Sequence, residues 1–314
     1  MLNDLSVVIP VLNESHLIKE LISRVIANVD NITKNYEVII VDDGSTDDTW
    51  HQIKLFAEQN FRIKAIKFSR NFGHHYAISA GLKNSNGSWV VVMDGDLQDR
   101  PEVIPTLYNK AQEGYDVVFV SRINRPENFI YKLLQKSFYF ILNNLSGINF
   151  ESSQANFSII SKKVVDAFNK FPENKRFYGS TIKWLGFKRT SISAEHGVRF
   201  AGKSSYTLKK RLNLAGDIIF AFSDKPLRFI VKLGLFFSSI SILLFVWIIY
   251  LYFTSGFEVQ GWTSLISSIF LFGGLILTVI GIIGIYIGRI FNEVKNRPLY
   301  ITSDELNINK NKED

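Results

Sequence analysis

Trp89-Val-Val-Val-Met-Asp-Gly-Asp96 is the stretch of sequence on which the fold prediction is built. The apolar run Trp89–Met93 is typical of a buried strand, and it ends in two carboxylates, Asp94 and Asp96, separated by one glycine. In open α/β sheets, ligands bind beyond the carboxyl ends of the strands. Oxygen ligands suit Mg²⁺ or Mn²⁺, which keep open positions for substrate phosphates. The stretch therefore indicates a metal-held diphosphate, although a bare D-x-D is more often a solvated turn.

Short apolar runs recur through residues 1–205, with helical segments between them. This alternation is typical of βαβ units and predicts an α/β domain with a mostly parallel sheet. No G-x-G-x-x-G follows the first strand and no G-x-x-x-x-G-K-[ST] occurs, which excludes dinucleotide-binding and P-loop proteins. The predicted strands are Ser6–Ile9, Glu37–Val41, Ile63–Phe68, Trp89–Met93 and Asp116–Val120, and the predicted helices are 14–29, 46–59, 75–83 and 101–113.

Polar turns follow the first four predicted strands, and in a parallel sheet they meet at one edge. Asp42 and Asp43 precede a Gly-Ser turn and a predicted helix, where an acidic residue or Ser45 can cap the helix. Two adjacent carboxylates exceed what capping needs, so we expect at least one to bind a base or ribose. His74 and His75 lack the spacing and the third ligand of a zinc site. We expect His74 to pack or to contact substrate.

The last third of the chain contains two apolar stretches. Leu233–Phe257 and Val259–Gly288 carry no charge and are interrupted only by Glu258. A helix of about 20 apolar residues spans a bilayer. We therefore predict a hairpin of two transmembrane helices near 231–253 and 264–288, in preference to a pair of buried core helices.

Basic residues flank both stretches, whereas the loop near 254–263 carries only one acidic residue. Basic residues mark the cytoplasmic side, so we predict a multi-pass protein of the plasma (inner) membrane. The N-terminus lacks the basic region of a signal peptide, and the soluble domain is expected to be cytoplasmic. The predicted organisation is a catalytic domain at 1–205, an amphipathic juxtamembrane helix at 206–228, the hairpin at 229–290, and a polar cytoplasmic tail at 291–314 that is disordered from about 301.

The formal net charge of +7 could indicate a nucleic-acid partner. Part of this excess is a juxtamembrane basic cluster, which favours anionic lipid headgroups instead. The absence of cysteine excludes disulfides and thiolate metal sites. Small residues on the second apolar stretch permit close helix packing, either within the hairpin or in a homo-oligomer. They are Gly273, Gly274, Gly281, Gly284 and Gly288.

Four turn segments resemble, in order and spacing, the family-2 glycosyltransferases. They are Val8-Ile-Pro-Val-Leu-Asn-Glu14, Val41-Asp-Asp-Gly-Ser-Thr-Asp-Asp-Thr49, Ser69-Arg-Asn-Phe-Gly-His74 and Met93-Asp-Gly-Asp-Leu-Gln-Asp99. The branch that they resemble contains the dolichol-phosphate-mannose synthases and bactoprenol-phosphate glucosyltransferases. Three downstream segments also look like that branch: Trp184-Leu-Gly-Phe187, Gly202-Lys-Ser-Ser-Tyr206 and Phe222-Ser-Asp-Lys-Pro-Leu-Arg228. The resemblance extends to about residue 297.

This resemblance implies a GT-A fold, which is a Rossmann-like nucleotide-diphospho-sugar transferase domain, and inversion at the anomeric carbon. It also implies a role in cell-wall or surface-polysaccharide biosynthesis. The donor would be a UDP- or GDP-sugar. The residues that the resemblance assigns to the nucleotide pocket are Pro10, Asn13 and Glu14, with Asp42 and Asp43 toward the base or ribose.

At the diphosphate, the resemblance places Asp94 and Asp96, with Asp96 as the principal ligand of Mg²⁺ or Mn²⁺. Two segments depart from the branch pattern. The branch usually reads D-P-P-E or a D-R-P-E-like pattern here, and Asp99-Arg-Pro-Glu102 keeps the acid and one proline. Ser152-Ser-Gln154 stands where many relatives carry an acidic residue.

The acceptor implied by the branch is a polyprenyl phosphate, whose oxygen is already ionised at pH 7 and needs no strong base. Asp99 would act as a base for a hydroxyl acceptor, and otherwise would orient groups. Residues Phe129–Leu145 suit a helix at the membrane surface, or equally a core helix with solvated lysines. The cations predicted to hold the acceptor phosphate are Arg122, Arg125, Lys132 and Lys136.

The sequence thus favours a membrane-anchored transferase that moves a sugar from a nucleotide-diphospho-sugar to a polyprenyl phosphate at the cytoplasmic face. An alternative enzyme adds a sugar to a lipid-linked saccharide or another glycan acceptor. A processive synthase is disfavoured because no Q-x-x-R-W is present. An alternative outside the enzymes is a membrane scaffold or nucleotide-sugar sensor.

Overall fold

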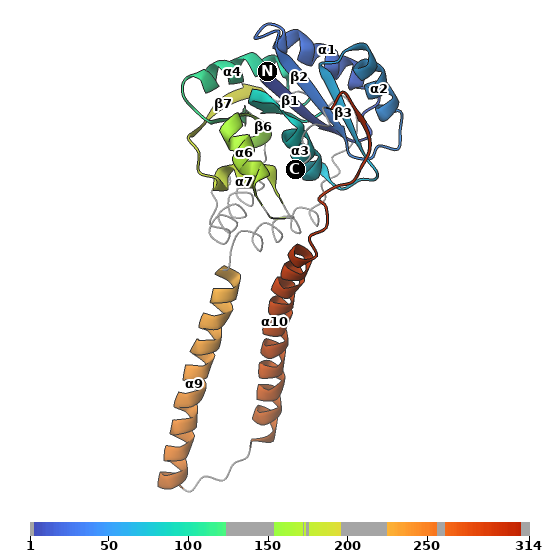
Figure 1. Ribbon diagram of the computed structural model, residues 1–314. Coiled ribbons are helices and arrows are strands. Elements are labelled where there is room, and N and C mark those ends of the chain that lie inside the picture. The colour runs from blue at the N-terminus through green and yellow to red at the C-terminus, as the bar shows by residue number, and fades with distance from the viewer. Residues whose placement is uncertain are drawn as a thin grey trace. The chain divides into compact units, whose positions relative to one another are not determined.

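The computed structural model describes residues 3–123, 154–171, 173, 176–195, 225–255 and 261–308. The chain divides into two compact units. The first unit contains an α/β sheet and includes the C-terminal segment from Pro298, and the second contains two long helices (Figure 1).

The first unit is built on an eight-stranded mixed sheet with the order β7-β5-β6-β4-β1-β2-β3-β8. Strands β1 to β4 are parallel to their neighbours within this group, β6 runs antiparallel between β4 and β5, and β7 is parallel to β5. The strand bounds are β1 Asn3–Val11, β2 Tyr36–Asp42, β3 Ile63–Phe68, β4 Gly87–Val92, β5 Val117–Ile123, β6 Gln154–Ser161, β7 Arg189–Glu195 and β8 Thr302–Leu306.

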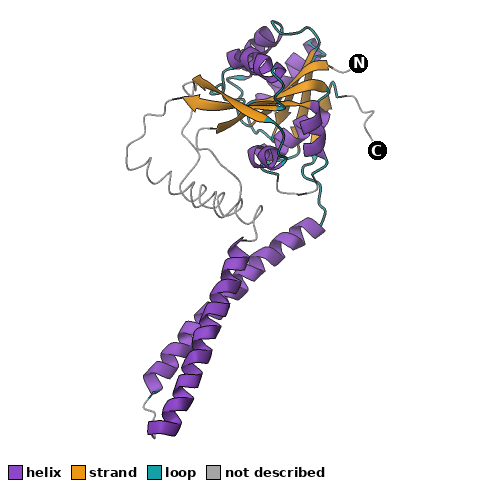
Figure 2. Cartoon of the chain, turned by 90° about the vertical axis from the view of Figure 1, so that its left-hand side faces the viewer, coloured by secondary structure: helices purple, strands orange, loops and turns teal. Residues whose placement is uncertain are grey.

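Helices cover both faces of this sheet (Figure 2). One face packs against α1 (Ile18–Val29), α2 (Thr49–Gln59) and α4 (Ile104–Gln112), the last preceded by the 3₁₀ turn η1 (Pro101–Val103). The other face packs against α3 (His74–Asn84), α6 (Lys162–Asn169) and α7 (Tyr178–Trp184).

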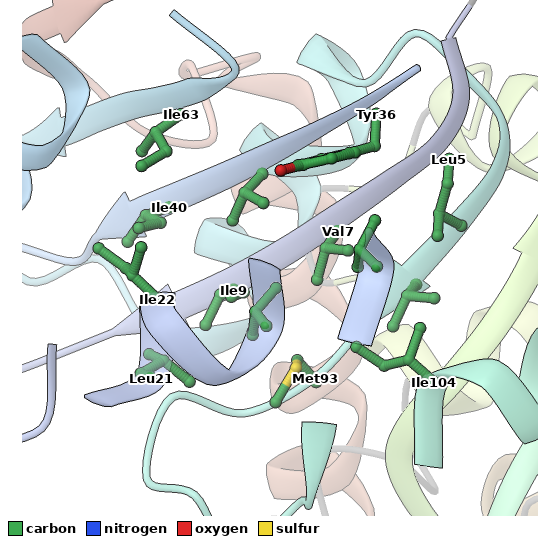
Figure 3. Close-up of a cluster of buried hydrophobic side chains, with 14 of the residues drawn as sticks. Leu5, Val7, Ile9, Leu21, Ile22, Tyr36, Ile40, Ile63, Met93 and Ile104 are labelled. Atoms are coloured by element: carbon green, nitrogen blue, oxygen red, sulfur yellow. The ribbon is translucent and has the colours of Figure 1, made fainter. Parts of the chain in front are cut away.

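Strand β1 shows why the sheet is buried on both sides. Leu5, Val7 and Ile9 belong to the cluster under α1, whereas Val8 belongs to the cluster under α3, and none of the four is exposed. Figure 3 shows side chains of the first cluster. Successive side chains point to opposite faces of a strand, so a continuous apolar run fits a parallel strand covered on both sides. Each such side chain contributes about 1.5–3 kcal/mol on burial.

The five predicted strands and the helices between them are confirmed, with differences at their ends. The clearest difference is the first helix, which was predicted from residue 14 and begins only at Ile18. The preceding backbone amides bond to side chains of the β2–α2 turn: Glu14 N–H donates to Thr49 Oγ1 at 2.9 Å and Ser15 N–H to Asp47 Oδ2 at 3.2 Å. These tertiary bonds hold the segment as a loop.

The predicted disorder of the tail is wrong for Thr302–Leu306, which form β8. This strand runs antiparallel to β3, with Leu306 opposite Ala65 and Thr302 opposite Phe68. The segment is polar, and within it Leu306 packs against the core. Pairing with β3 satisfies backbone groups that an uncovered edge strand would leave open. Its stability therefore comes from the partner edge more than from its own composition.

The second unit contains α9 (Lys225–Ser255) and α10 (Trp262–Val294), which enclose the predicted spans 231–253 and 264–288. Within the described part of the chain, one helical segment, Ser268–Val294, is long and apolar enough to cross a membrane by length and composition. The transmembrane hairpin therefore stays a prediction. The predicted juxtamembrane helix lies outside the described residues up to residue 224, as do residues 129–145.

A buried polar network ties the amino-terminal ends of the strands together. Glu37 on β2 accepts hydrogen bonds from Ser6 Oγ and from the backbone N–H of Asn86, each at 2.6 Å. Its other oxygen lies 2.5 Å from Lys64 Nζ on β3, and both members of this ion pair are buried. One carboxylate thus links β1, β2, β3 and the turn before β4.

We expect Glu37→Ala to lower the free energy of unfolding by about 3–5 kcal/mol, because it leaves the ammonium group of Lys64 buried without its partner. Thermal unfolding of the full chain in detergent measures the loss. The matched control is Glu113→Ala, which removes an exposed pair with Lys110 and should change stability by less than about 1 kcal/mol. Equal losses in the two variants would contradict the assigned role of Glu37.

Candidate functional site

The carboxyl ends of β1, β2, β3 and β4 lie along one edge of the sheet, because these strands are parallel. The four polar turns singled out in the sequence follow them. The structure therefore brings together the turns that the strand pattern predicted to meet. Their residues are 12–17, 43–48, 69–73 and 93–100.

The β1–α1 loop and the β2–α2 turn are joined through Asn13. Its backbone N–H donates to Ser45 Oγ at 2.9 Å, and its side-chain Oδ1 accepts from the N–H of Thr46 at 2.9 Å. Asn13 has φ of 54°, a left-handed conformation that asparagine tolerates better than most residues. Pro10 is buried in β1 just before this loop, and Glu14 follows on it. The three predicted nucleotide-pocket residues thus lie on one segment.

Asp42 ends β2 and is fully buried. Its Oδ1 accepts a hydrogen bond from the Ser45 N–H at 2.8 Å, whereas Oδ2 is a buried oxygen with no hydrogen-bond donor among the described residues. Burial raises the pKa of this carboxyl, against the effect of the Ser45 bonds. A buried acceptor without a donor is costly, and a ligand N–H or O–H would remove that cost. Asp42 therefore fits the predicted contact to a base or ribose.

Asp43 has a structural task. Its carboxylate accepts the backbone N–H of Phe72 at 2.8 Å and that of Gly73 at 3.0 Å, which ties the β2–α2 turn to the β3–α3 loop. Burial raises the pKa of Asp43, although the two backbone bonds oppose the shift. The close approach requires Gly44, which has φ of 76°, and whose Cβ would lie 2.3 Å from the carbonyl carbon of Arg70.

The turn after β4 carries the paired carboxylates. The backbone N–H of Asp94 donates to Asp99 Oδ2 at 3.3 Å, and Asp96 Oδ1 accepts from the N–H of Gln98 at 3.1 Å. Gly95 separates the two acids because a Cβ at this position would lie 2.6 Å from Val11 Cγ1 on β1. Close packing against β1 thus explains the glycine, and it holds both acids at the sheet edge.

His74, the first residue of α3, lies beside this turn. Its Nε2 is 3.1 Å from Asp94 Oδ1 and 3.4 Å from Asn156 Nδ2 on β6. Partial burial opposes protonation, but the carboxylates of Asp94, Asp43 and Asp96 outweigh it and raise the pKa of the imidazole. Sequence reasoning expected packing or substrate contact and missed the ion pair. The available signal was that His74 follows the third turn, which faces the same edge.

The donor atoms at this turn fit a divalent cation. No group of three or more His, Asp or Glu side chains that could hold a metal occurs in the described part of the chain. Mg²⁺ is commonly held by one or two carboxylates, with substrate phosphates and water as its other ligands. Asp94 and Asp96 supply two hard oxygen donors from one turn, so the pair suits a metal that is completed by a diphosphate.

Residues 99–102, which form one of the two segments that depart from the branch pattern, make contacts that hold the turn after β4 in place. Asp99 is 4% exposed and bonds to the Asp94 amide. Arg100 pairs with Glu195 on β7 at 3.2 Å. Glu102 pairs with Arg24 on α1 at 2.8 Å, which lowers the pKa of its carboxyl. These contacts fix the turn that carries the paired carboxylates.

The side chains predicted to bind the acceptor phosphate lie outside the described residues. Arg122 lies on β5 with its backbone opposite Ala194 of β7, but its side chain lies outside the described residues. Arg125, Lys132 and Lys136 also lie outside them. Their role stays a prediction.

Comparison with known proteins gives the family. Residues 6–168, which include all four turns, match the model described as Glycosyl transferase family 2. The chain belongs to glycosyltransferase family 2. The resemblance carried by the four turns is thereby confirmed.

Two relatives align along nearly the whole chain. The bactoprenol glucosyl transferase of Shigella phage SfII is 36% identical over 95% of this chain and 96% of its own. The undecaprenyl-phosphate 4-deoxy-4-formamido-L-arabinose transferase of Proteus mirabilis is 32% identical over 100% of this chain and 98% of its own. The alignment therefore includes the C-terminal helices as well as the sheet.

Among solved structures, the fold is similar to that of the mannosyltransferase PcManGT from Pyrobaculum calidifontis, solved in complex with GDP-Man and Mn²⁺. The TM-score is 0.50 at 18% identity, and the match covers 73% of this chain and 65% of that one. At this identity the likeness shows the fold alone. It confirms the predicted GT-A architecture.

His75, next to His74, is half-buried and packs edge-on against Phe177, with ring centroids 5.4 Å apart. Its Nδ1 accepts a hydrogen bond from the backbone N–H of Tyr178 at 3.4 Å. Burial, followed by the charge of His74, lowers the pKa of His75 to about 4. The ring is therefore neutral at pH 7 and joins α3 to α7.

We expect this histidine to make stability depend on pH. Its folded pKa is about 4 and lies below the unfolded value of about 6.5. The stability that neutral His75 contributes is therefore present above pH 6.5 and is lost as the pH falls toward 4. Between pH 7 and 4.5 the wild type should lose about 2 kcal/mol more than His75→Gln. Unfolding of both at several pH values measures the difference, with exposed His51→Gln as the control. Parallel curves for wild type and His75→Gln would refute the assignment.

Proposed function

We propose that the protein transfers a sugar from a UDP- or GDP-sugar to a polyprenyl phosphate at the cytoplasmic face of the membrane, with inversion at the anomeric carbon. The observation that carries the proposal is the Asp94-Gly95-Asp96 turn at the carboxyl end of β4, packed on β1 and paired with His74. Near full-length similarity to a bactoprenol glucosyl transferase and an undecaprenyl-phosphate sugar transferase supports the acceptor class.

On this proposal the donor lies across the ends of β1, β2 and β4. Asp42 receives a hydrogen bond from the base or ribose at its buried Oδ2, and the Asn13–Glu14 segment, with Pro10 beneath it, forms the adjacent wall. Asp94 and Asp96 flank the diphosphate. Together they hold Mg²⁺ or Mn²⁺, which when bound supplies Lewis-acid stabilisation of the leaving group.

The reaction breaks the bond between the anomeric carbon and the β-phosphate oxygen while an acceptor oxygen attacks from the opposite face. Negative charge develops on the departing nucleotide diphosphate. His74 lies beside Asp94, and the carboxylates around it raise the pKa of its imidazole, which favours the positively charged form. A fixed positive group near developing negative charge stabilises the transition state.

A phosphate acceptor needs cations more than a base. We assign Arg122, Arg125, Lys132 and Lys136 to this task. Asp99 is then an orienting residue, in agreement with its burial and its bond to the Asp94 amide. A hydroxyl of a lipid-linked saccharide is the alternative acceptor, and it would require Asp99 to leave that bond and act as the base.

The apolar helices provide a membrane anchor for this reaction. Large hydrophobic side chains are exposed along α10, among them Phe270, Leu271 and Leu277 at 60% or more. Exposed apolar surface of this extent marks an interaction with a membrane or a protein. We propose that α9 and α10 form the predicted two-span hairpin and keep the domain beside its lipid acceptor. Close packing at the small residues of α10 would allow a homo-oligomer.

Asp96→Asn should lower transfer at least about 100-fold, because it removes a carboxylate from the diphosphate position. The assay offers the purified chain radiolabelled UDP-glucose, GDP-mannose or UDP-GlcNAc with undecaprenyl phosphate and Mg²⁺ or Mn²⁺, and counts lipid-extractable label. Asp166→Asn, which changes an exposed side chain on α6, is the control and should keep wild-type activity. Activity of Asp96→Asn close to wild type would remove the metal assignment, and no labelled lipid from any donor would count against the acceptor.

Replacing Lys132 and Lys136 together with Ala should raise the KM for undecaprenyl phosphate more than the KM for the nucleotide-sugar. The reason is that the two ammonium groups attract the acceptor phosphate and do not contact the donor. Steady-state kinetics with each substrate varied in turn measures both constants. Lys34 and Lys54, which are exposed on the first unit, are replaced together as the control. An unchanged acceptor KM would exclude Lys132 and Lys136 from the site.

A further inference from the structure

The C-terminal segment 300–307 is attached along the whole of β3. The carbonyl of Ile301 accepts the backbone N–H of Ser69 at 2.9 Å, just where β3 ends and the β3–α3 loop begins. At the other end, Asn307 Nδ2 donates to the carbonyls of Ala57 at 2.7 Å and Ile63 at 2.9 Å. The strand is therefore bonded at both ends of β3 as well as along the ladder.

Tyr300 begins this segment and continues the contact into the active-site edge. Its ring stacks on Phe68, with centroids 4.8 Å apart and an interplanar angle of 14°. Phe68 in turn meets Phe72 edge-on at 5.7 Å. Burial raises the pKa of Tyr300 to about 12, so the ring is neutral at every working pH. Three aromatic rings thus connect the C-terminal segment to the β3–α3 loop.

The same loop carries groups of the donor site. The amides of Phe72 and Gly73 bond to Asp43, and the next residue, His74, pairs with Asp94. A shift of Phe72 would therefore move the two amides from Asp43 and the imidazole from Asp94 together. Rings packed in low-energy contact resist such a shift.

We propose that Tyr300 is a positioning residue for the donor site, which acts through Phe68 and Phe72 to fix the Ser69–Gly73 loop and His74. The proposal rests on the proposed donor site. It gives the C-terminal segment 300–307 a role in positioning the donor site, beyond covering the edge of β3. Sequence reasoning assigned this segment to a disordered tail, and no motif in it signals the role.

The segment that contains Tyr300 also follows the second long helix closely in the chain. Helix α10 ends at Val294, and residues 295–299 alone separate it from Tyr300. At about 3.5 Å per residue, this linker reaches on the order of 18 Å when fully extended. The residue that steadies the loop is thus covalently attached, through a short linker, to the helix predicted to cross the membrane.

Hydrogen exchange of the full chain in detergent tests the proposal without any substrate. In Tyr300→Ala, the amides of Phe72 and Gly73 should exchange about tenfold faster than in the wild type, which corresponds to about 1.4 kcal/mol. Tyr300→Phe keeps the stacked ring and should exchange as the wild type does. Tyr300→Leu, which keeps apolar volume without a planar ring, serves if Tyr300→Ala does not fold, and it should be intermediate.

The control is Tyr115→Ala, which removes a half-buried ring that packs at the start of β5. It should leave exchange of Phe72 and Gly73 unchanged, even where it lowers the thermal midpoint as much as Tyr300→Ala. In transfer assays, Tyr300→Ala should raise the donor KM about tenfold and leave the acceptor KM within about twofold.

Unchanged protection of Phe72 and Gly73 in Tyr300→Ala and Tyr300→Leu would overturn the proposal, as would equal acceleration in Tyr115→Ala. A rise in the acceptor KM alone would also overturn it. Because the exchange readout needs no donor or acceptor, it stands apart from the transfer assay. Failure to find a sugar donor would thus contradict the proposed function. The hydrogen-exchange result would still test whether Tyr300 positions the Ser69–Gly73 loop.

Discussion

The bonds from the backbone amides of Phe72 and Gly73 to the carboxylate of Asp43 are the constraint on which the rest of the site depends. They bring the β2–α2 turn against the β3–α3 loop, so close that only glycine fits at position 44. These two charge-assisted bonds offset only part of the cost of burying Asp43. They also hold the residues that lead directly into α3, whose first residue, His74, lies beside Asp94.

The site gathers acidic groups that would repel one another in isolation. Asp42, Asp43, Asp94 and Asp96 lie on two turns at one sheet edge, and the imidazole of His74 lies 3.1 Å from Asp94 on the second turn. Burial raises the pKa of Asp42 and Asp43, so each negative charge there is held at a cost. A divalent cation with a nucleotide diphosphate changes that balance, because the metal binds carboxylates and phosphates together. The acidic edge is therefore suited to a ligand that carries its own cation.

The sequence predicted the strands well because each is an apolar run covered on both faces, and it predicted that the four turns meet at one edge because all four follow parallel strands. It could not predict interactions set by partners distant in sequence. The pairing of His74 with Asp94 depends on where α3 lies relative to β4. The strand Thr302–Leu306 is polar, and the edge of β3 decides its structure. The first helix was predicted to begin at residue 14, but it begins at Ile18. The hydrogen bond from the Glu14 amide to the side chain of Thr49 holds the preceding residues as a loop.

The amino and carboxyl ends of the parallel strands have different roles, and β8 runs along β3 from one end to the other. At the amino ends, Glu37 and Lys64 form a buried ion pair that fixes the strands and has no access to a ligand. At the carboxyl ends, Asp42 keeps one buried oxygen without a hydrogen-bond donor among the described residues, and the half-exposed Asp94 and Asp96 are accessible to a ligand. Because β8 runs antiparallel to β3, it enters beside the site at Tyr300 and ends beside the structural network at Asn307. Loss of the Asn307 bonds would therefore weaken the fold, whereas loss of the Tyr300 ring would loosen the site. A single short strand thus separates, by position along its length, an effect on stability from an effect on catalysis.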